Sequence, residues 1–248
     1  MRYYTKTDIG MVRSNNQDSV AAFRRGAYTC AVVCDGMGGA NGGNIASSMA
    51  VSAFCEKVRK NLAAASPDEL TGGDLGRLLQ AAVEDANDRV YNRALYELGL
   101  EGMGTTLVGV IASEDGAVAI NVGDSRIYAL KSGKLEQISR DHSFVQYLID
   151  RGAISRGEAK HHPNRNIILK AVGISENIDG EVFYIRDFDY LLLCTDGLTN
   201  HVEDFEIQSI LSGTPGRRTS VTSRIDSLIA LANSRGGTDN ITVAIIGR

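Results

Sequence analysis

The chain has 248 residues and a formal net charge of −4, with 43% apolar and 23% charged residues. This composition suits a globular protein with a substantial core, and the acidic balance argues against a broad basic face for nucleic acid. The N-terminus lacks the apolar stretch of a signal peptide, and the apolar runs are too short to span a bilayer. We therefore expect a cytoplasmic protein with no membrane partner.

The four cysteines show neither a CxxC pattern nor a zinc-type spacing with histidine: Cys30, Cys34, Cys55 and Cys194. We expect buried free thiols in a reducing compartment. The chain has three prolines, no low-complexity linker and no internal repeat. A single domain spanning residues 1–248 is therefore expected, as a monomer.

In the first half of the chain, alternating apolar residues on either side of Arg25 and Gly26 predict a hairpin formed by residues 19–24 and 28–34. Two stretches with helical apolar spacing follow, from Ala46 to Val58 and from Leu75 to Val90. A second hairpin is expected from residues 105–112 and 117–123.

The second half begins with a third hairpin, formed by residues 126–130 and 134–138. A variable stretch, about 144–175, precedes a strand at 181–185 and the apolar run YLLLC. An amphipathic helix from Val221 to Ala232 then leads into a strand at 241–246. Paired helices between long runs of strands favour an α+β fold with antiparallel sheets over a parallel doubly wound sheet.

Four aspartates stand at the edges of apolar, strand-like runs: Asp35, Asp124, Asp196 and Asp239. A single aspartate in such a place is usually a turn former or a helix cap, but four together are hard to explain as turns. Carboxylates brought together on folding repel one another and are costly to desolvate, so a positive charge has to lie among them. Oxygen-only ligands favour a hard divalent cation, Mg²⁺ or Mn²⁺.

The glycine-rich segment DGMGGANGG, residues 35–43, departs from both nucleotide-binding glycine motifs. The dinucleotide fingerprint would need glycine at Asn41, and no GK[ST] follows for a P-loop. Either a tight turn lets the Gly36 carbonyl act as a ligand beside Asp35, or the segment is a plain turn before a helix.

Upstream, the segment GMVRSNNQD carries two further candidates. Asp18 is either a turn residue or an outer carboxylate that orients metal-bound water. Arg13 is either a solvated surface group or a guanidinium fork that binds two phosphate oxygens.

Taken together, these segments carry a family resemblance. The chain is similar to the protein phosphatase 2C family of metal-dependent serine/threonine phosphatases, above all to its compact bacterial members, over about residues 8–246. The motifs occur in the family's order: GMVRSNNQD, CDGMGG, MGTTL, VGDSR, CTDGL and TDNITV. The resemblance implies a four-layer α-β-β-α sandwich in which two central antiparallel sheets are flanked by helix pairs.

The resemblance also implies a two-metal core. Asp35 resembles the aspartate that bridges both cations, and Gly36 lends its carbonyl to one of them. Asp196 and Asp239 resemble ligands of the other cation. With Arg13, these three aspartates would form the catalytic set.

Outside that core, Asp18 resembles the carboxylate that holds metal-bound waters. Asp124 resembles the ligand of a third, weaker cation, with Asp196 shared, and Arg13 resembles the phosphate clamp. Thr105 and Asn240 match motif positions that shape the site, without an assigned chemical role.

The expected reaction is hydrolysis of phosphoserine and phosphothreonine in proteins by direct attack of a metal-activated water. No cysteine has an arginine six places on, so a cysteine phosphatase loop is absent. The expected partners are phosphorylated proteins and a bacterial serine/threonine kinase system that the enzyme would oppose. Two alternatives remain: a phosphoprotein-binding module without turnover, and a different two-metal hydrolase such as a nuclease or pyrophosphatase.

The stretch 144–175 resembles the flap that borders the active site. Its histidines, His161 and His162, are read either as plain surface groups or as contacts to substrate. Positive charge nearby is expected to meet an acidic phosphopeptide, and it comes from three residues: Arg156, Lys160 and Arg165.

Overall fold

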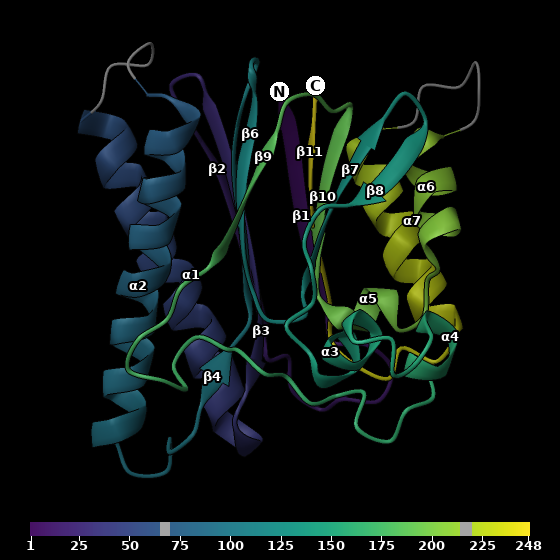
Figure 1. The fold of residues 1–248 in the computed structure, drawn as a ribbon. Helices are drawn as coiled ribbons and strands as arrows, with labels where there is room; N and C mark the ends of the chain where they lie inside the picture. Colours follow the sequence, from purple (N-terminus) through teal and green to yellow (C-terminus); the bar gives the residue numbers. More distant parts are fainter. Residues whose placement is uncertain (65–69, 214–219) are drawn as a thin grey trace.

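The computed structural model describes residues 1–64, 70–213 and 220–248. Two antiparallel sheets lie face to face (Figure 1). The first contains β2 (Asp18–Arg25), β3 (Tyr28–Met37), β5 (Leu107–Ser113), β6 (Gly116–Val122) and β9 (Glu181–Ile185), in that spatial order, with the short β4 (Gly104–Thr105) paired to β3.

The second sheet has the order β1 (Arg2–Asp8), β11 (Ile241–Gly247), β10 (Tyr190–Cys194), β7 (Arg126–Lys131) and β8 (Lys134–Gln137). Helices α1 (Gly39–Ala64) and α2 (Gly72–Tyr96) cover the outer face of the first sheet, while α6 (Asp204–Ser212) and α7 (Val221–Ser234) cover that of the second (Figure 1). The expected four-layer α-β-β-α sandwich is confirmed.

Three apolar clusters fill the three spaces between these layers. Strand β3 contributes side chains to two of these clusters. Its side chains alternate in direction, so Cys30, Val32 and Cys34 pack under α1 and α2, while Ala31 and Val33 face the other sheet. A strand buried on both faces reads as a continuous apolar run, which accounts for the sequence CAVVC.

The three expected hairpins and three expected helices are present, and the four cysteines are buried free thiols. The sequence patterns did not predict strand β1, whose side chains are mostly exposed or half-buried. They also missed α5 (Asp196–Thr199), a single helical turn that begins where a strand-end turn was expected.

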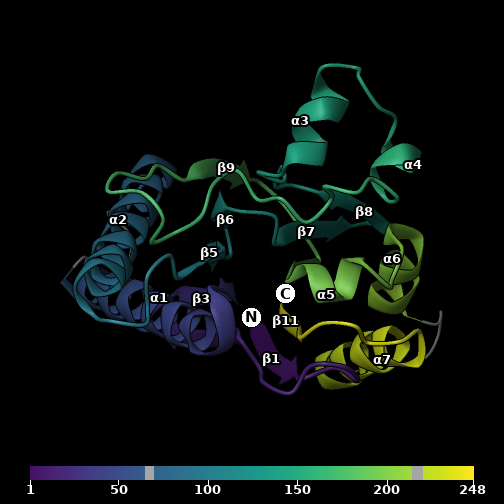
Figure 2. The ribbon, with the colours of Figure 1, turned by 90° about the horizontal axis from the view of Figure 1, so that it is seen from below.

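Strand direction decides where the functional residues meet. Strands β3, β6 and β10 end, and β2 and β11 begin, at the same edge of the sandwich, the lower edge in Figure 1, opposite the two termini. The short helices α3 (Phe144–Asp150), α4 (Arg156–Ala159) and α5 gather at this end, and α3 and α4 project from the sandwich in Figure 2.

No helix in the described parts of the chain is long and apolar enough to cross a membrane.

Candidate metal centre and phosphate site

The five predicted aspartates lie at the same edge of the sandwich. Asp18 and Asp35 face each other in register on β2 and β3, Asp124 follows β6, Asp196 follows β10, and Asp239 precedes β11. Burial raises the pKa of Asp35 well above its usual value, and repulsion from each of the other four aspartates raises it further. These carboxyls therefore lie close enough to act on one another electrostatically.

Asp18 is buried, and only one of its carboxyl oxygens has a partner. The Thr195 hydroxyl donates to Asp18 Oδ2 over 2.9 Å, whereas Oδ1 accepts no hydrogen bond from any described residue. Burial, opposed by hydroxyl hydrogen bonds and reinforced by Asp196 and Asp239, raises the pKa of Asp18 to about 7. A buried oxygen without a donor is a position that a cation or its water can fill.

Two neighbouring threonines fix the backbone at Asp35. The Asp35 amide donates to Thr106 Oγ1 over 2.9 Å, and the Thr105 hydroxyl donates to the Asp35 carbonyl over 2.8 Å. Thr105, to which the sequence assigned no role, therefore helps to hold the strand end that carries Asp35.

Gly36 lies where no side chain fits. A Cβ at this position would come within 2.0 Å of the Gly43 carbonyl oxygen and 2.6 Å of the Gln17 carbonyl oxygen. The Gly36 amide donates to the Gln17 carbonyl over 3.1 Å, so the backbones pack closely. This close approach explains the glycine, while the role of its carbonyl as a ligand remains a prediction.

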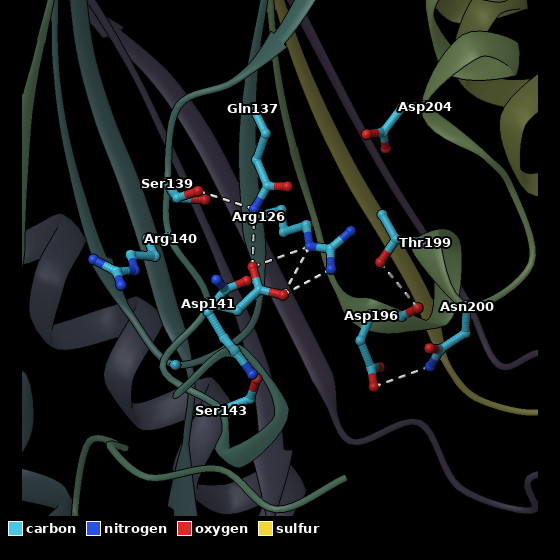
Figure 3. A network of polar contacts seen from close by, with 12 residues as sticks. Arg126, Gln137, Ser139, Arg140, Asp141, Ser143, Asp196, Thr199, Asn200 and Asp204 are labelled. Carbon is cyan, nitrogen blue, oxygen red and sulfur yellow. Dashed lines mark hydrogen bonds and ion pairs between the residues drawn. The ribbon is translucent and has the colours of Figure 1, made fainter. Parts of the chain in front are cut away.

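Asp196 is the first residue of α5 and connects the two sheets electrostatically. Burial raises its pKa, with repulsion from Asp239 next, while hydrogen bonds from Asn200 and the Asp35 carboxyl lower it. The Asn200 side-chain amide donates to Asp196 Oδ2 over 3.1 Å (Figure 3). Asp35 belongs to the first sheet and Asp196 to the second, so their contact spans the sandwich.

Asp124 lies in the turn between β6 and β7. Burial raises its pKa to about 8, and repulsion from Asp196 and Asp141 contributes, while the positive charge of Arg126 lowers it. The next residue, Ser125, is fully buried, and its hydroxyl lies 2.7 Å from Thr106 Oγ1. A nucleophilic role for Ser125 is therefore disfavoured.

Arg13 and Asp239 pair directly at the open side of the site. Arg13 Nη2 donates to Asp239 Oδ2 over 2.8 Å, with both side chains partly exposed. An exposed ion pair of this kind contributes little stability. It does hold the guanidinium next to the carboxyl cluster, where a phosphate clamp is expected.

Asn240 binds the loop that carries Arg13. Its side-chain amide donates to the Ile9 and Asn15 carbonyls over 2.9 and 3.0 Å, and its oxygen accepts from the Gln17 amide over 2.8 Å. The sequence placed Asn240 in a motif but did not reveal these contacts, because its partners lie more than 220 positions away.

The residues present fit divalent cations. The donor set consists of carboxylate oxygens, one of them buried without a partner, and repulsion from the neighbouring aspartates raises the pKa of Asp35. In the described chain, no three acidic, histidine or cysteine side chains already surround one point as ligands.

An isolated bridge between Thr105 and Val172 links the flap to the body, and one between Ser143 and Ile168 closes the root of the flap. Its expected cationic face is partly neutralised, because Lys160 Nζ pairs with Glu203 at 2.5 Å. The His162 ring lies 5.9 Å from that of Phe144, which gives it a packing contact within the flap.

Comparison with known proteins agrees with this geometry. The model of the protein phosphatase 2C family matches residues 12–215. The serine/threonine phosphatase stp of Listeria welshimeri is 37% identical over 246 residues, which is 98% of this chain and 94% of that protein. PstP of Mycobacterium tuberculosis is 39% identical, over 99% of this chain and 44% of its own length.

Solved structures agree equally well in fold. Stp1 from Staphylococcus aureus superposes with a TM-score of 0.88 at 33% identity, over 99% of this chain and 94% of that one. The catalytic domain of PstP in complex with two manganese ions gives 0.82 at 34% identity, over 98% and 96% of the two chains.

Proposed function

The chain belongs to the protein phosphatase 2C family, and we propose that its five clustered aspartates hold the divalent cations with which it dephosphorylates proteins. It is a metal-dependent serine/threonine phosphatase. The observation that carries the proposal is the convergence of five carboxyls at one edge of the sandwich, where burial and mutual repulsion raise the pKa of four of them: Asp18, Asp35, Asp124 and Asp196.

We assign the core pair of cations to Asp35, the Gly36 carbonyl, Asp196 and Asp239. Asp124 and Asp196 would hold a third, weaker cation. The two manganese ions in the PstP complex support the count of two in the core. When bound, such a pair supplies a water of lowered pKa and positive charge for the phosphoryl oxygens.

Arg13 binds and orients the substrate phosphate. Its planar fork matches two phosphoryl oxygens, and it already lies beside Asp239. A phosphate that enters the site would compete with Asp239 for this guanidinium, leaving that carboxylate free to turn toward the cluster. Arg13 would then offset charge on the transferred group.

Asp18 orients the attacking water. Oδ2 is held by Thr195 and Oδ1 is left free, so the carboxyl has a fixed direction and one open acceptor. A covalent phosphoenzyme on cysteine is disfavoured, because all four thiols are buried and burial raises the pKa of Cys194 to about 12.

The finer assignments follow from the same site. Mg²⁺ and Mn²⁺ both suit an all-oxygen donor set. Phosphorylated proteins made by a serine/threonine kinase are the substrates. We also propose that the chain works as one domain, because the cluster between the sheets includes residues from Val20 to Ile246.

A phosphothreonine peptide tests the proposal. The metal-stripped protein should be inactive, and Mn²⁺ or Mg²⁺ should restore phosphate release. Asp35→Asn should lose at least about a thousandfold in kcat/KM, because it replaces the shared carboxylate with a neutral amide. Asp88→Asn, on the exposed face of α2, is the matched control and should keep full activity. Phosphate release in excess EDTA, or an active Asp35→Asn, would refute the assignment.

A further inference from the structure

A second charged group lies beside the aspartate cluster and takes no part in the reaction described above. The Arg126 Nε donates to both Asp141 oxygens at 3.0 Å, and Arg126 Nη2 donates to Asp141 Oδ2 at 2.7 Å (Figure 3). Gln137 Nε2 also donates to Asp141 Oδ1 over 2.9 Å. The pair is therefore held in one geometry rather than being a loose surface contact.

Backbone contacts place this pair next to Asp124. The His142 amide donates to the Gly123 carbonyl over 2.9 Å, and the Gly123 amide donates to His142 Nδ1 over 3.1 Å. Asp141 and Asp124 are the chain neighbours of these two residues, so they lie on adjoining segments. Arg126 follows Asp124 by two positions.

Opposite charges therefore act on the same carboxyl. The Asp141 side chain is only 9% exposed and that of Arg126 28%. At such burial, water and salt screen these charges weakly, so each reaches the neighbouring carboxyls.

We propose that the Arg126–Asp141 pair sets how tightly a cation binds between Asp124 and Asp196. This inference rests on the proposed function, in which those two carboxylates share a weaker cation site. With the pair intact, its two charges largely cancel at the site. Without Arg126, the site gains negative charge and binds cations more tightly, whereas without Asp141, the unopposed guanidinium repels them.

Calorimetric titration of the metal-stripped protein with MnCl₂ at pH 8 tests the inference without relying on activity. Arg126→Gln should tighten the weakest Mn²⁺ site by about tenfold, and Asp141→Asn should weaken it by about the same factor. The double variant should return to within about threefold of the parent.

Three further variants keep the result interpretable. Arg126→Lys retains the charge and should bind Mn²⁺ as the parent does, even if its geometry is looser. Arg89→Gln, on α2 and paired with Glu56 of α1, should change nothing. In an Asp124→Asn background, Arg126→Gln and Asp141→Asn should have no effect, because the site they act on is gone.

The outcomes separate the two claims. The inference would be overturned if both single variants bound Mn²⁺ more weakly than the parent. It would also be overturned if the double variant bound Mn²⁺ no more tightly than Asp141→Asn. Either result would mean that the pair has a purely structural role. Unchanged affinity in both would overturn it as well, while the proposed function would stand. If the parent bound no Mn²⁺ at all, the proposed function and this inference would fall together.

Discussion

The clustered aspartate carboxyls reduce the stability of the folded chain. Asp18 is buried and Asp124 half-buried among like charges, with pKa values raised to about 7 and about 8, and burial raises those of Asp35 and Asp196 as well. A raised carboxyl pKa means that the ionised form is less stable in the folded protein than in the unfolded chain. Without bound cations, the ionised carboxylates therefore lower the stability of the folded protein.

Removing one of these charges should stabilise the metal-free protein. Asp35→Asn keeps the size of the side chain and eliminates the repulsion from its neighbours, so its melting temperature in EDTA should exceed that of the parent. Differential scanning calorimetry measures this. A lower melting temperature than the parent, with Asp88→Asn unchanged, would contradict the electrostatic account.

The pH dependence follows with a definite sign. Because the folded pKa values lie above the unfolded one, the folded state binds more protons between about pH 4 and pH 8. The free energy of unfolding of the metal-free protein should therefore fall as the pH rises through this window. Urea unfolding in EDTA at a series of pH values measures it, and Asp124→Asn should flatten the slope. A free energy that rises from pH 5 to pH 8 would be the opposite result.

At the scale of elements, the loop between β1 and β2 carries Arg13 and is fixed from a distant part of the chain. Asn240, next to β11, makes three hydrogen bonds with this loop. The Met11 amide adds a fourth link, because it donates to the Gly237 carbonyl over 2.8 Å. Arg13 is therefore positioned by the segment that also carries Asp239.

Asn240→Ala should loosen this loop and raise KM more than it lowers kcat, since Arg13 would lose its fixed position. Loss of the three bonds should also cost about 1–3 kcal/mol of stability. Steady-state kinetics with a phosphothreonine peptide and urea unfolding measure the two effects. Asn61→Ala, which removes one exposed bond on α1, is the matched control. An unchanged KM in Asn240→Ala would show that the loop holds Arg13 without this residue.

The elements differ in how far the sequence could predict them. Hairpins such as β5–β6 were found because alternating apolar residues and a turn pair specify them locally. Strand β1 was missed because its exposed edge position leaves no alternation to detect. The acidic residues beside strands were visible as a pattern. The sequence carried no signal for Asp141, because this residue reaches the site only when the neighbouring His142 packs against Gly123 in the folded protein.

At the scale of the whole molecule, the site joins the two halves of the sandwich. Asp18 and Asp35 lie on the first sheet, Asp196 and Asp239 flank strands of the second, and Asp124 lies in the turn that passes from one sheet to the other. A cation held between them, as proposed, would link the two sheets and would interact only with the folded state. Binding should therefore stabilise the protein by mass action.

Mn²⁺ should accordingly raise the melting temperature of the metal-stripped protein. At a concentration a hundred times the dissociation constant, the gain is about 2.7 kcal/mol, or roughly 5–10 °C for a chain of this size. The shift should be larger at pH 8 than at pH 5, where protons compete for the carboxylates. Equal melting-temperature shifts at both pH values would count against carboxylate ligands. Calcium-free buffer with added KCl serves as the ionic-strength control.

The most direct measurement is anomalous diffraction at the manganese edge from crystals of this protein grown with MnCl₂. The account predicts two strong peaks within ligand distance of Asp35, one of them also touching Asp196 and Asp239, and a weaker peak beside Asp124. Strong peaks elsewhere on the surface, with none among these carboxylates, would contradict it.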